Sequence, residues 1–306
     1  MKFNSQYMQQ VDLLLDVLPI LNQFECFALK GGTAINLFIR NMPRLSVDID
    51  LAYLPIEPRD IFLKNITDEM LKLKQLIQDK NFKVQETRTQ DQQLSKLVVH
   101  GHQTAIKIEP NLVIRGSAFN CEEYDLCQNA QDQFLKYCRI RSLSAADIYG
   151  GKICAALDRQ HPRDLFDIHQ LFFHEKRISD KIRQAFIVYL CSGNRPIHEM
   201  LSAELKLSNF TDEFYNEFQG MTIVPISNEM LLNARNQLVH TILNDFSDNE
   251  RQFLLSVKLG EPDWSLMQIP DIEKLPALQW KILNIKRMDK DKRQVLFKKL
   301  YSVLEL

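Results

Sequence analysis

Apolar residues near the start of the chain recur at the spacing of one helix face. The positions are Val11, Leu14, Leu15, Leu18 and Leu21. They predict a helix over about 6–21. The run ECFALKGG then predicts a short apolar strand that ends at a glycine pair. A helix is expected from Thr33 to about Arg40, because Pro43 prevents its continuation.

Polar and apolar positions alternate in the segment LSVDIDLAYL, which follows this helix. Ser46, Asp48 and Asp50 share one side of the alternation, so the segment predicts a half-buried strand. A long helix is expected over about 59–78. Three further alternating runs, FKVQETRT, SKLVVHG and TAIKIEPNLV, are joined by short polar links and predict an antiparallel meander.

Strand signals almost vanish after about Leu143. Five segments have helical periodicity: SAADIYGGKICAALD, RDLFDIHQLFF, ISDKIRQAFIVYL, NEMLLNARNQLVHTIL and ERQFLLSVKL. Ser247 and Glu250 form the pattern of a capping box before the last of them. We therefore expect an α+β domain with a mixed sheet over 1–143 and a mostly helical domain over 144–306.

Composition narrows the class of protein only a little. The chain has 306 residues, of which 45% are hydrophobic and 25% charged, and a net charge of −1, so contact with nucleic acid must come from a local patch. No run approaches the roughly 18 apolar residues of a spanning helix. Asp12 and Asp16 interrupt the first apolar stretch, unlike in a signal peptide. We expect a cytoplasmic protein without membrane contact, whose six cysteines are reduced.

Asp48 and Asp50 are the strongest candidates for catalytic, metal-binding residues. Residues i and i+2 of a strand share a face, so the two carboxylates repel each other unless a cation between them offsets the repulsion. Glu109 lies on the alternating face of a later strand and can supply a third carboxylate. Mg²⁺ or Mn²⁺ prefers such oxygen ligands. The alternative is a solvated strand face, with Glu109 in a surface stripe beside Lys107.

The glycine pair before the first short helix is a second candidate. Gly31 and Gly32 allow backbone N–H groups to approach a phosphate closely, and the Thr33 hydroxyl stands at the same turn. A glycine pair is more often an ordinary turn, so this feature is weak when it stands alone.

Together these motifs resemble the polymerase β-like nucleotidyltransferase superfamily. The strings LKGGTAINLF and RLSVDIDL are similar to those of the AbiEii-type toxins of type IV toxin–antitoxin and abortive-infection systems. The similarity continues through DIYGGKICAALDRQHPRDLFDIHQL and into the tail ERQFLLSVKLGEPDW and LPALQWKILNI, so it spans most of the chain. The resemblance implies a polymerase β-like N-terminal lobe and a helical lobe that completes the active cleft.

The resemblance also implies roles for a second set of residues. Lys152 would reach the triphosphate of a bound nucleotide, and Arg163 would belong to the same binding site. Asp164 and Asp167 share a helix face, where an aspartate would orient Lys152, contact the nucleotide or help to activate an acceptor hydroxyl. In isolation, Lys152 would be expected to extend to solvent, and the aspartates to cap their helix.

The activity implied is metal-dependent transfer of an NMP from an NTP to an acceptor hydroxyl. The family suggests an RNA acceptor, such as a tRNA 3′ end, and a cognate antitoxin that represses transcription. Asp48, Asp50, Lys152, Asp164 and Asp167 would be catalytic. The alternatives are transfer to a small molecule or protein side chain, and a catalytically silent nucleotide- or RNA-binding module.

One local basic run occurs at the end of the chain, in WKILNIKRMDKDKRQVLFKKL. It carries eight lysines and arginines against two aspartates. Such a run is either a solvated helix face or a surface for an RNA backbone, where contacts position the RNA without specifying its sequence.

Overall fold

The computed structural model of the chain describes residues 2–175, 177–202 and 218–305. It divides the chain into two compact units. The first contains Met1–Ile148 together with Gln219–Pro225, and the second contains Tyr149–Phe218 and Ile226–Leu306. The chain therefore passes from one unit to the other three times.

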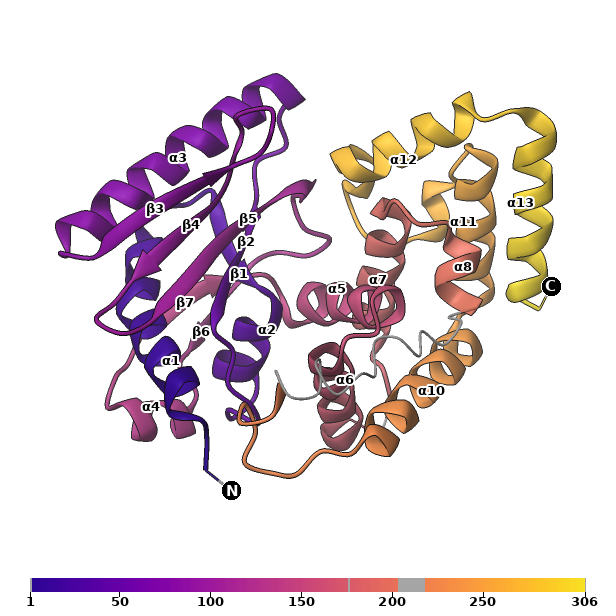
Figure 1. Cartoon of the computed structure of the whole chain (residues 1–306). Coiled ribbons are helices and arrows are strands. Elements are labelled where there is room, and N and C mark those ends of the chain that lie inside the picture. The colour runs from indigo at the N-terminus through magenta and orange to yellow at the C-terminus, as the bar shows by residue number, and fades with distance from the viewer. Residues whose placement is uncertain (1, 176, 203–217, 306) are drawn as a thin grey trace. The chain divides into compact units, whose positions relative to one another are not determined.

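The first unit is built on a seven-stranded mixed sheet with the order β3-β4-β5-β2-β1-β7-β6 (Figure 1). The strands are β1 (Phe27–Lys30), β2 (Asp48–Tyr53), β3 (Lys83–Arg88), β4 (Leu94–His100), β5 (Ala105–Arg115), β6 (Glu122–Asp125) and β7 (Arg139–Ser142). β2 pairs parallel with β5 and antiparallel with β1. The expected meander is confirmed, since β3, β4 and β5 pair antiparallel in succession.

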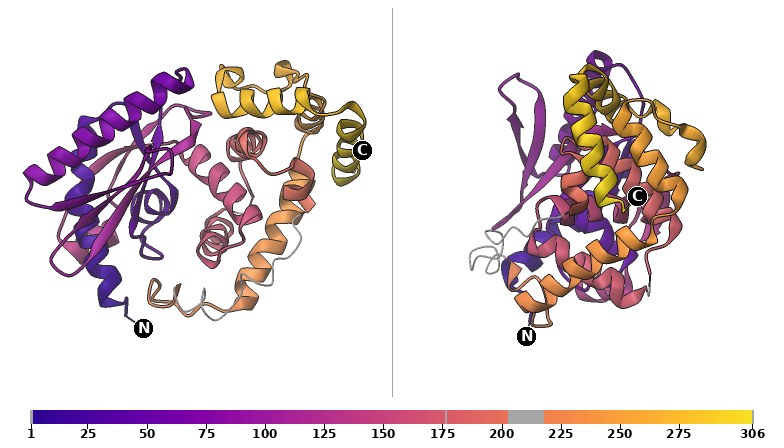
Figure 2. Two further views of the ribbon diagram at one scale, coloured as in Figure 1. Left: turned by 45° about the horizontal axis from the view of Figure 1, so that its top comes forward. Right: turned by 90° about the vertical axis from the view of Figure 1, so that its right-hand side faces the viewer.

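Helices cover both faces of this sheet. α1 (Ser5–Val17) and α3 (Arg59–Asp79) pack on one face, and α2 (Gly31–Ala34) lies on the other, beside β1 and β2 (Figures 1 and 2). Asn4 caps α1, and a 3-10 turn over Leu18–Gln23 extends it. α2 continues as a π-helical turn over Ile35–Ile39, and α4 (Gln128–Phe134) precedes β7.

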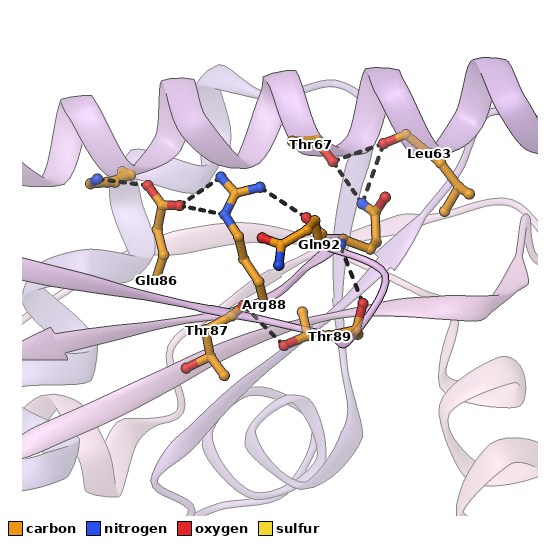
Figure 3. A network of polar contacts seen from close by, with 10 residues as sticks. Leu63, Thr67, Glu86, Thr87, Arg88, Thr89 and Gln92 are labelled. Carbon is orange, nitrogen blue, oxygen red and sulfur yellow. Dashed lines mark hydrogen bonds and ion pairs between the residues drawn. The ribbon is translucent and has the colours of Figure 1, made fainter.

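A polar network fastens the hairpin of β3 and β4 to α3 (Figure 3). Glu86 accepts hydrogen bonds from Lys74 of α3 at 2.7 Å and from Arg88 at 2.7 Å. Gln93, at the turn, donates to the Thr67 hydroxyl of α3 at 2.6 Å. These contacts add to the apolar packing of the hairpin, whose Val84, Leu94, Leu97 and Val99 are buried.

The second unit is helical. α5 (Ala145–Asp158) begins in the first unit, because the boundary between Ile148 and Tyr149 falls inside it. The other helices are α6 (Pro162–His174), α7 (Asp180–Ser192), α8 (Ile197–Ser202), α10 (Asn228–Asp245), α11 (Asp248–Leu259), α12 (Pro276–Arg287) and α13 (Lys290–Val303), with 3-10 turns at Trp264–Leu266 and Ile272–Lys274. Fully buried Phe186, Phe253 and Leu254 contribute to its core.

The predicted fold class is confirmed: a mixed sheet forms the first half and helices the second. The capping box of Ser247 and Glu250 is also present, at the start of α11. The sequence analysis missed β6 and β7, which have four residues each and no clear alternation. All six cysteines are free thiols. Among the described helices, none combines the length and hydropathy needed to cross a membrane.

Candidate active site

The glycine pair at the start of α2 packs directly against three side chains. Arg44 and Ser46 precede β2, and Asp50 lies within it. Gly31 has φ +74°, in the left-handed region that favours glycine, and a Cβ built on it would collide with the Asp50 carboxylate. A Cβ on Gly32 would lie 2.7 Å from Nη2 of Arg44 and 2.9 Å from the Ser46 hydroxyl. Both glycines are thus needed for close approach to other side chains, whatever ligand the turn holds.

The Thr33 hydroxyl is fully buried and bonds within the protein. It lies 2.5 Å from the main-chain oxygen of Asp48 and 3.1 Å from the Ser46 hydroxyl. A hydroxyl has one proton to donate, and here it is directed to Asp48. Thr33 therefore fastens the start of β2 to the glycine turn. Its expected contact with triphosphate oxygens stays a prediction.

Strand register brings the three predicted metal ligands onto one face of the sheet. Asp50 is in register with Glu109 of β5 and, on its other side, with Lys30 of β1. Asp48 is in register with Lys107. Residues opposite each other on neighbouring strands project from the same face. Asp48, Asp50 and Glu109 therefore share a face with two lysines, as the alternation predicted.

The carboxylates differ in their present contacts. Glu109 lies 3.4 Å from Nζ of Lys96 on β4. Within the described residues, no hydrogen bond or ion pair engages the Asp50 carboxylate, which packs against Gly31. The described chain contains no cluster of three or more His, Cys, Asp or Glu side chains already arranged around a metal position. The donor chemistry fits a hard divalent ion, but Glu109 must first turn away from Lys96.

A separate cluster, which we call the lysine–aspartate cluster, lies in the second unit and consists of Lys152, Asp164, Asp167 and Arg159. Nζ of Lys152 on α5 lies 2.7 Å from Asp164 and 3.0 Å from Asp167, both on α6. Lys152 is 7% exposed, and the two aspartates are buried. The expectation that Lys152 would extend to solvent in isolation is not met, because two carboxylates hold its ammonium group.

Arg159 is the member of the cluster that the sequence analysis did not identify. Its Nε lies 2.5 Å from Oδ2 of Asp164 and its Nη2 lies 3.0 Å from Oδ1. Burial opposes ionisation of Asp164, but the charge of Lys152 and the hydrogen bonds from Arg159 outweigh it, so the pKa of this carboxyl lies well below its ordinary value. The only sequence signal was a basic residue one turn before Pro162, which is too common to indicate a site.

Arg163 lies beside the cluster in sequence but does not join its ion pairs. Its backbone N–H donates to Nδ1 of His161, which caps α6 ahead of Pro162. Its half-buried guanidinium has no hydrogen bond or ion pair with the described part of the chain. A contact between Arg163 and a nucleotide stays a prediction.

A strand, a glycine pair and a short helix are followed by a strand with two aspartates in a mixed sheet, in the order expected of a nucleotidyltransferase. The sequence model described as "Nucleotidyl transferase AbiEii toxin, Type IV TA system" matches residues 12–281, and the chain belongs to this family. It is therefore a nucleotidyltransferase toxin of the type IV toxin–antitoxin systems, a family that implies an NTP substrate and an antitoxin partner.

A solved structure has a similar fold over nearly its whole length. It is MenT4, the nucleotidyltransferase toxin Rv2826c from Mycobacterium tuberculosis H37Rv. The two chains are 16% identical and superpose with a TM-score of 0.60, over 98% of this chain and 95% of that one. No curated protein sequence matches this chain.

Proposed function

We propose that this toxin transfers an NMP from an NTP to a hydroxyl of an RNA, namely the 3′ end of a tRNA, in a reaction that needs Mg²⁺. One observation carries the metal part of the proposal: Asp48, Asp50 and Glu109 lie in register on one face of neighbouring strands. Asp48 and Asp50 would hold the ion, joined by Glu109. The bound ion would neutralise charge on the phosphates and on the attacking and leaving oxygens.

The glycine turn would bind the triphosphate. The backbone N–H groups at the start of α2 would donate to phosphate oxygens. Thr33 would act indirectly, by holding Asp48 in place through its hydrogen bond. The acceptor hydroxyl would then attack the α-phosphorus, and pyrophosphate would leave.

Lys152 would serve the same reaction as a positive charge for the nucleotide, as the family resemblance implies. Asp164 and Asp167 hold its ammonium at 2.7 and 3.0 Å, so their proposed role is to orient it. Loss of Lys152 alone would leave two buried carboxylates short of a partner, a change that generally costs about 3–5 kcal/mol. Inactivity of Lys152→Met is therefore no test of catalysis unless folding is measured too.

The decisive experiment targets Asp50. Asp50→Asn is nearly isosteric, and the native carboxylate makes no polar contact in the described residues, so the fold should be kept. Purified protein is incubated with each α-labelled NTP, Mg²⁺ and total RNA, and label on RNA is quantified. We expect transfer to fall at least about a hundredfold, a loss typical for a group that stabilises transition-state charge.

The matched control is Asp91→Asn at the exposed tip of the β3–β4 hairpin, which should keep full activity. Undiminished transfer by Asp50→Asn would disprove the mechanism. Label on a small molecule or protein in place of RNA would assign a different acceptor to the same chemistry. No Mg²⁺-dependent NTP turnover with any acceptor would favour a silent binding module.

A further inference from the structure

Lys258 of α11 is a buried cation that the proposed reaction does not use. Only 4% of its side chain is exposed. Within the described parts of the chain it forms no ion pair or hydrogen bond through its ammonium group. Buried lysines normally have a carboxylate partner, because an isolated ammonium loses its hydration. Nζ of Lys258 is not among the fully buried unpaired side-chain atoms of the described chain, so the ammonium group keeps some access to solvent and to a ligand.

His198 of α8 provides a second unpartnered polar group nearby. It is 8% exposed, and its Nδ1 atom is buried without a hydrogen-bond partner. Burial, followed by the positive charge of Lys258, lowers the pKa of His198. α11 and α8 both pack against α13, which brings the two residues into one region of the second unit (Figure 1).

The charges around this pair are mostly positive. The positive charge of Lys281 on α12 lowers the pKa of Lys258, and that of Lys299 on α13 lowers the pKa of His198. Glu199 is the acid whose charge reaches both, and it lies 3.5 Å from Arg195. Lys281 donates to the main-chain oxygens of Gly193 and Arg195 at 2.6 and 2.8 Å, so no carboxylate neutralises it there.

These charges match a compact anion. Burial, with a smaller contribution from Lys281, lowers the pKa of Lys258 to about 8, so most molecules still carry the charge at pH 7. A phosphate group has several acceptor oxygens and up to two negative charges, and lysines bind it as point charges. Because Lys258 is 4% exposed, the accessible part of its ammonium group is small and matches a single phosphate group better than a long stretch of backbone.

We propose that Lys258 and His198, supported by Lys281 and Lys299, form a binding site for a single phosphate group in the second unit. The four residues come from α8, α11, α12 and α13, and none of these helices carries a residue of the lysine–aspartate cluster or the metal strands. The site is therefore additional to the groups that would hold the NTP. The phosphate belongs either to a free phosphate compound or to an RNA.

Isothermal titration with inorganic phosphate, at constant ionic strength set by chloride, tests the site directly. The full-length wild type should bind phosphate with release of heat and show a higher melting temperature in its presence. Lys258→Met should lower the affinity at least about tenfold, since it removes the buried charge. The variant is expected to fold, because methionine fills the same space without the cost of burying an ammonium group.

Lys298→Met is the matched control, because it removes an exposed lysine from α13 next to Lys299. It should bind phosphate as the wild type does. A 5′-phosphorylated RNA oligonucleotide that competes with phosphate, and loses this competition in Lys258→Met, would assign the group to RNA. Phosphate binding without such competition would assign it to a free compound. Equal phosphate affinity in the wild type and Lys258→Met, or no binding to either, would overturn the proposal.

Discussion

Gly31 determines where the Asp50 carboxylate can lie. Its positive φ and the contact with Asp50 are two independent reasons for a glycine, one in the backbone and one in packing. The sequence alone suggested only that a phosphate might approach this turn. The structure adds that a proposed metal ligand already occupies the space that a side chain would need.

Gly31→Ala should therefore damage both folding and activity. The left-handed backbone alone costs about 1–2 kcal/mol for a residue with a Cβ, and the overlap with Asp50 adds to it. We expect a lower midpoint of urea unfolding and a loss of Mg²⁺-dependent transfer. Gly151→Ala is the control: a Cβ there meets nothing within 4 Å, and alanine favours the helix by up to about 1 kcal/mol. Equal stability of the two variants would contradict the argument.

Lys258 should make stability depend on pH in the alkaline range. Its pKa is about 8 in the folded protein against 10.5 for an ordinary lysine, so the unfolded chain binds more protons between these values. The destabilisation caused by Lys258 should therefore shrink as pH rises from about 8 to 10.5. At pH 7 Lys258→Met should be more stable by about 3 kcal/mol, the equivalent of this shift. By pH 11 the difference should be gone.

Urea unfolding in phosphate-free buffer measures this difference, because a bound anion would offset it. Lys298→Met again serves as the control and should show no such trend. A constant difference between Lys258→Met and the wild type across pH 7–11 would show that Lys258 is not desolvated in the folded state.

The residues that sequence analysis found are those whose side chains belong to a short motif. Asp48, Asp50 and Glu109 followed from strand alternation, which register then supported. Arg159 and Lys258 were not identifiable. The importance of Arg159 arises from the burial of its partner Asp164, and that of Lys258 from its own burial without a partner in the described chain. The buried state of Thr33 was equally invisible, since a hydroxyl beside a glycine pair looks the same whether it faces a ligand or the core.

At the scale of elements, four neighbouring strands each contribute one charged side chain to a row across the sheet. The strands are β4, β5, β2 and β1. Lys96, Glu109, Asp50 and Lys30 follow one another through the strand pairings and the Lys96–Glu109 ion pair. Lys96 and Glu109 are 32% and 42% exposed, and exposed pairs contribute only about 0.2–1 kcal/mol. The ion pair is thus weak enough for a divalent ion to compete for Glu109.

Lys96→Gln should consequently ease metal binding. With Glu109 released, the Mg²⁺ concentration for half-maximal transfer should fall by up to about fivefold, the equivalent of the ion pair's energy. A Mg²⁺ titration of NMP transfer measures this change. Lys83→Gln on β3 removes an exposed lysine outside the row and should leave the titration unchanged. A higher Mg²⁺ requirement in Lys96→Gln would mean that Lys96 assists the site.

Long periodic elements were predicted from sequence more successfully than short ones. α3, α10 and the meander had enough repeats for their period to be recognised, and the glycine pair marked the end of β1. β6 and β7 could not be recognised in this way, because their own sequences lack a strand pattern. They are strands because β6 pairs with β7 and β7 pairs with β1. The π-helical turn after α2 likewise follows from packing and not from a sequence signal.

For the molecule as a whole, a net charge of −1 means that RNA binding must rely on a local surface. α13 lies beyond the residues that match the family model and carries several cations without ion pairs in the described chain. They are Lys290, Lys292, Arg293, Lys298 and Lys299. The proposed RNA acceptor would therefore be expected to contact α13.

Replacing Lys290, Lys292 and Arg293 together by Gln should weaken RNA binding and its dependence on salt. Each lost phosphate contact lowers the slope of log K against log salt by about 0.7–0.9, so a change of about two is expected. Fluorescence anisotropy with labelled tRNA at several salt concentrations measures the slope. The control replaces Lys64, Lys80 and Lys83 of the first unit, with the same change in net charge. Equal slopes for the two variants would exclude α13 as the RNA surface.

The excursion of Gln219–Pro225 into the first unit has a consequence for any attempt to divide or recombine this protein. Main-chain oxygens of Gly220 and Met221 accept hydrogen bonds from Asn4 and Leu45, and Leu45 leads into the strand that carries Asp48 and Asp50. A gene fragment ending at residue 148 would therefore lack part of the unit it encodes. Chimaeras between relatives should exchange this seven-residue segment together with residues 1–148. If residues 1–148 came from one relative and the rest of the chain from another, β2 would be separated from the segment that supports it.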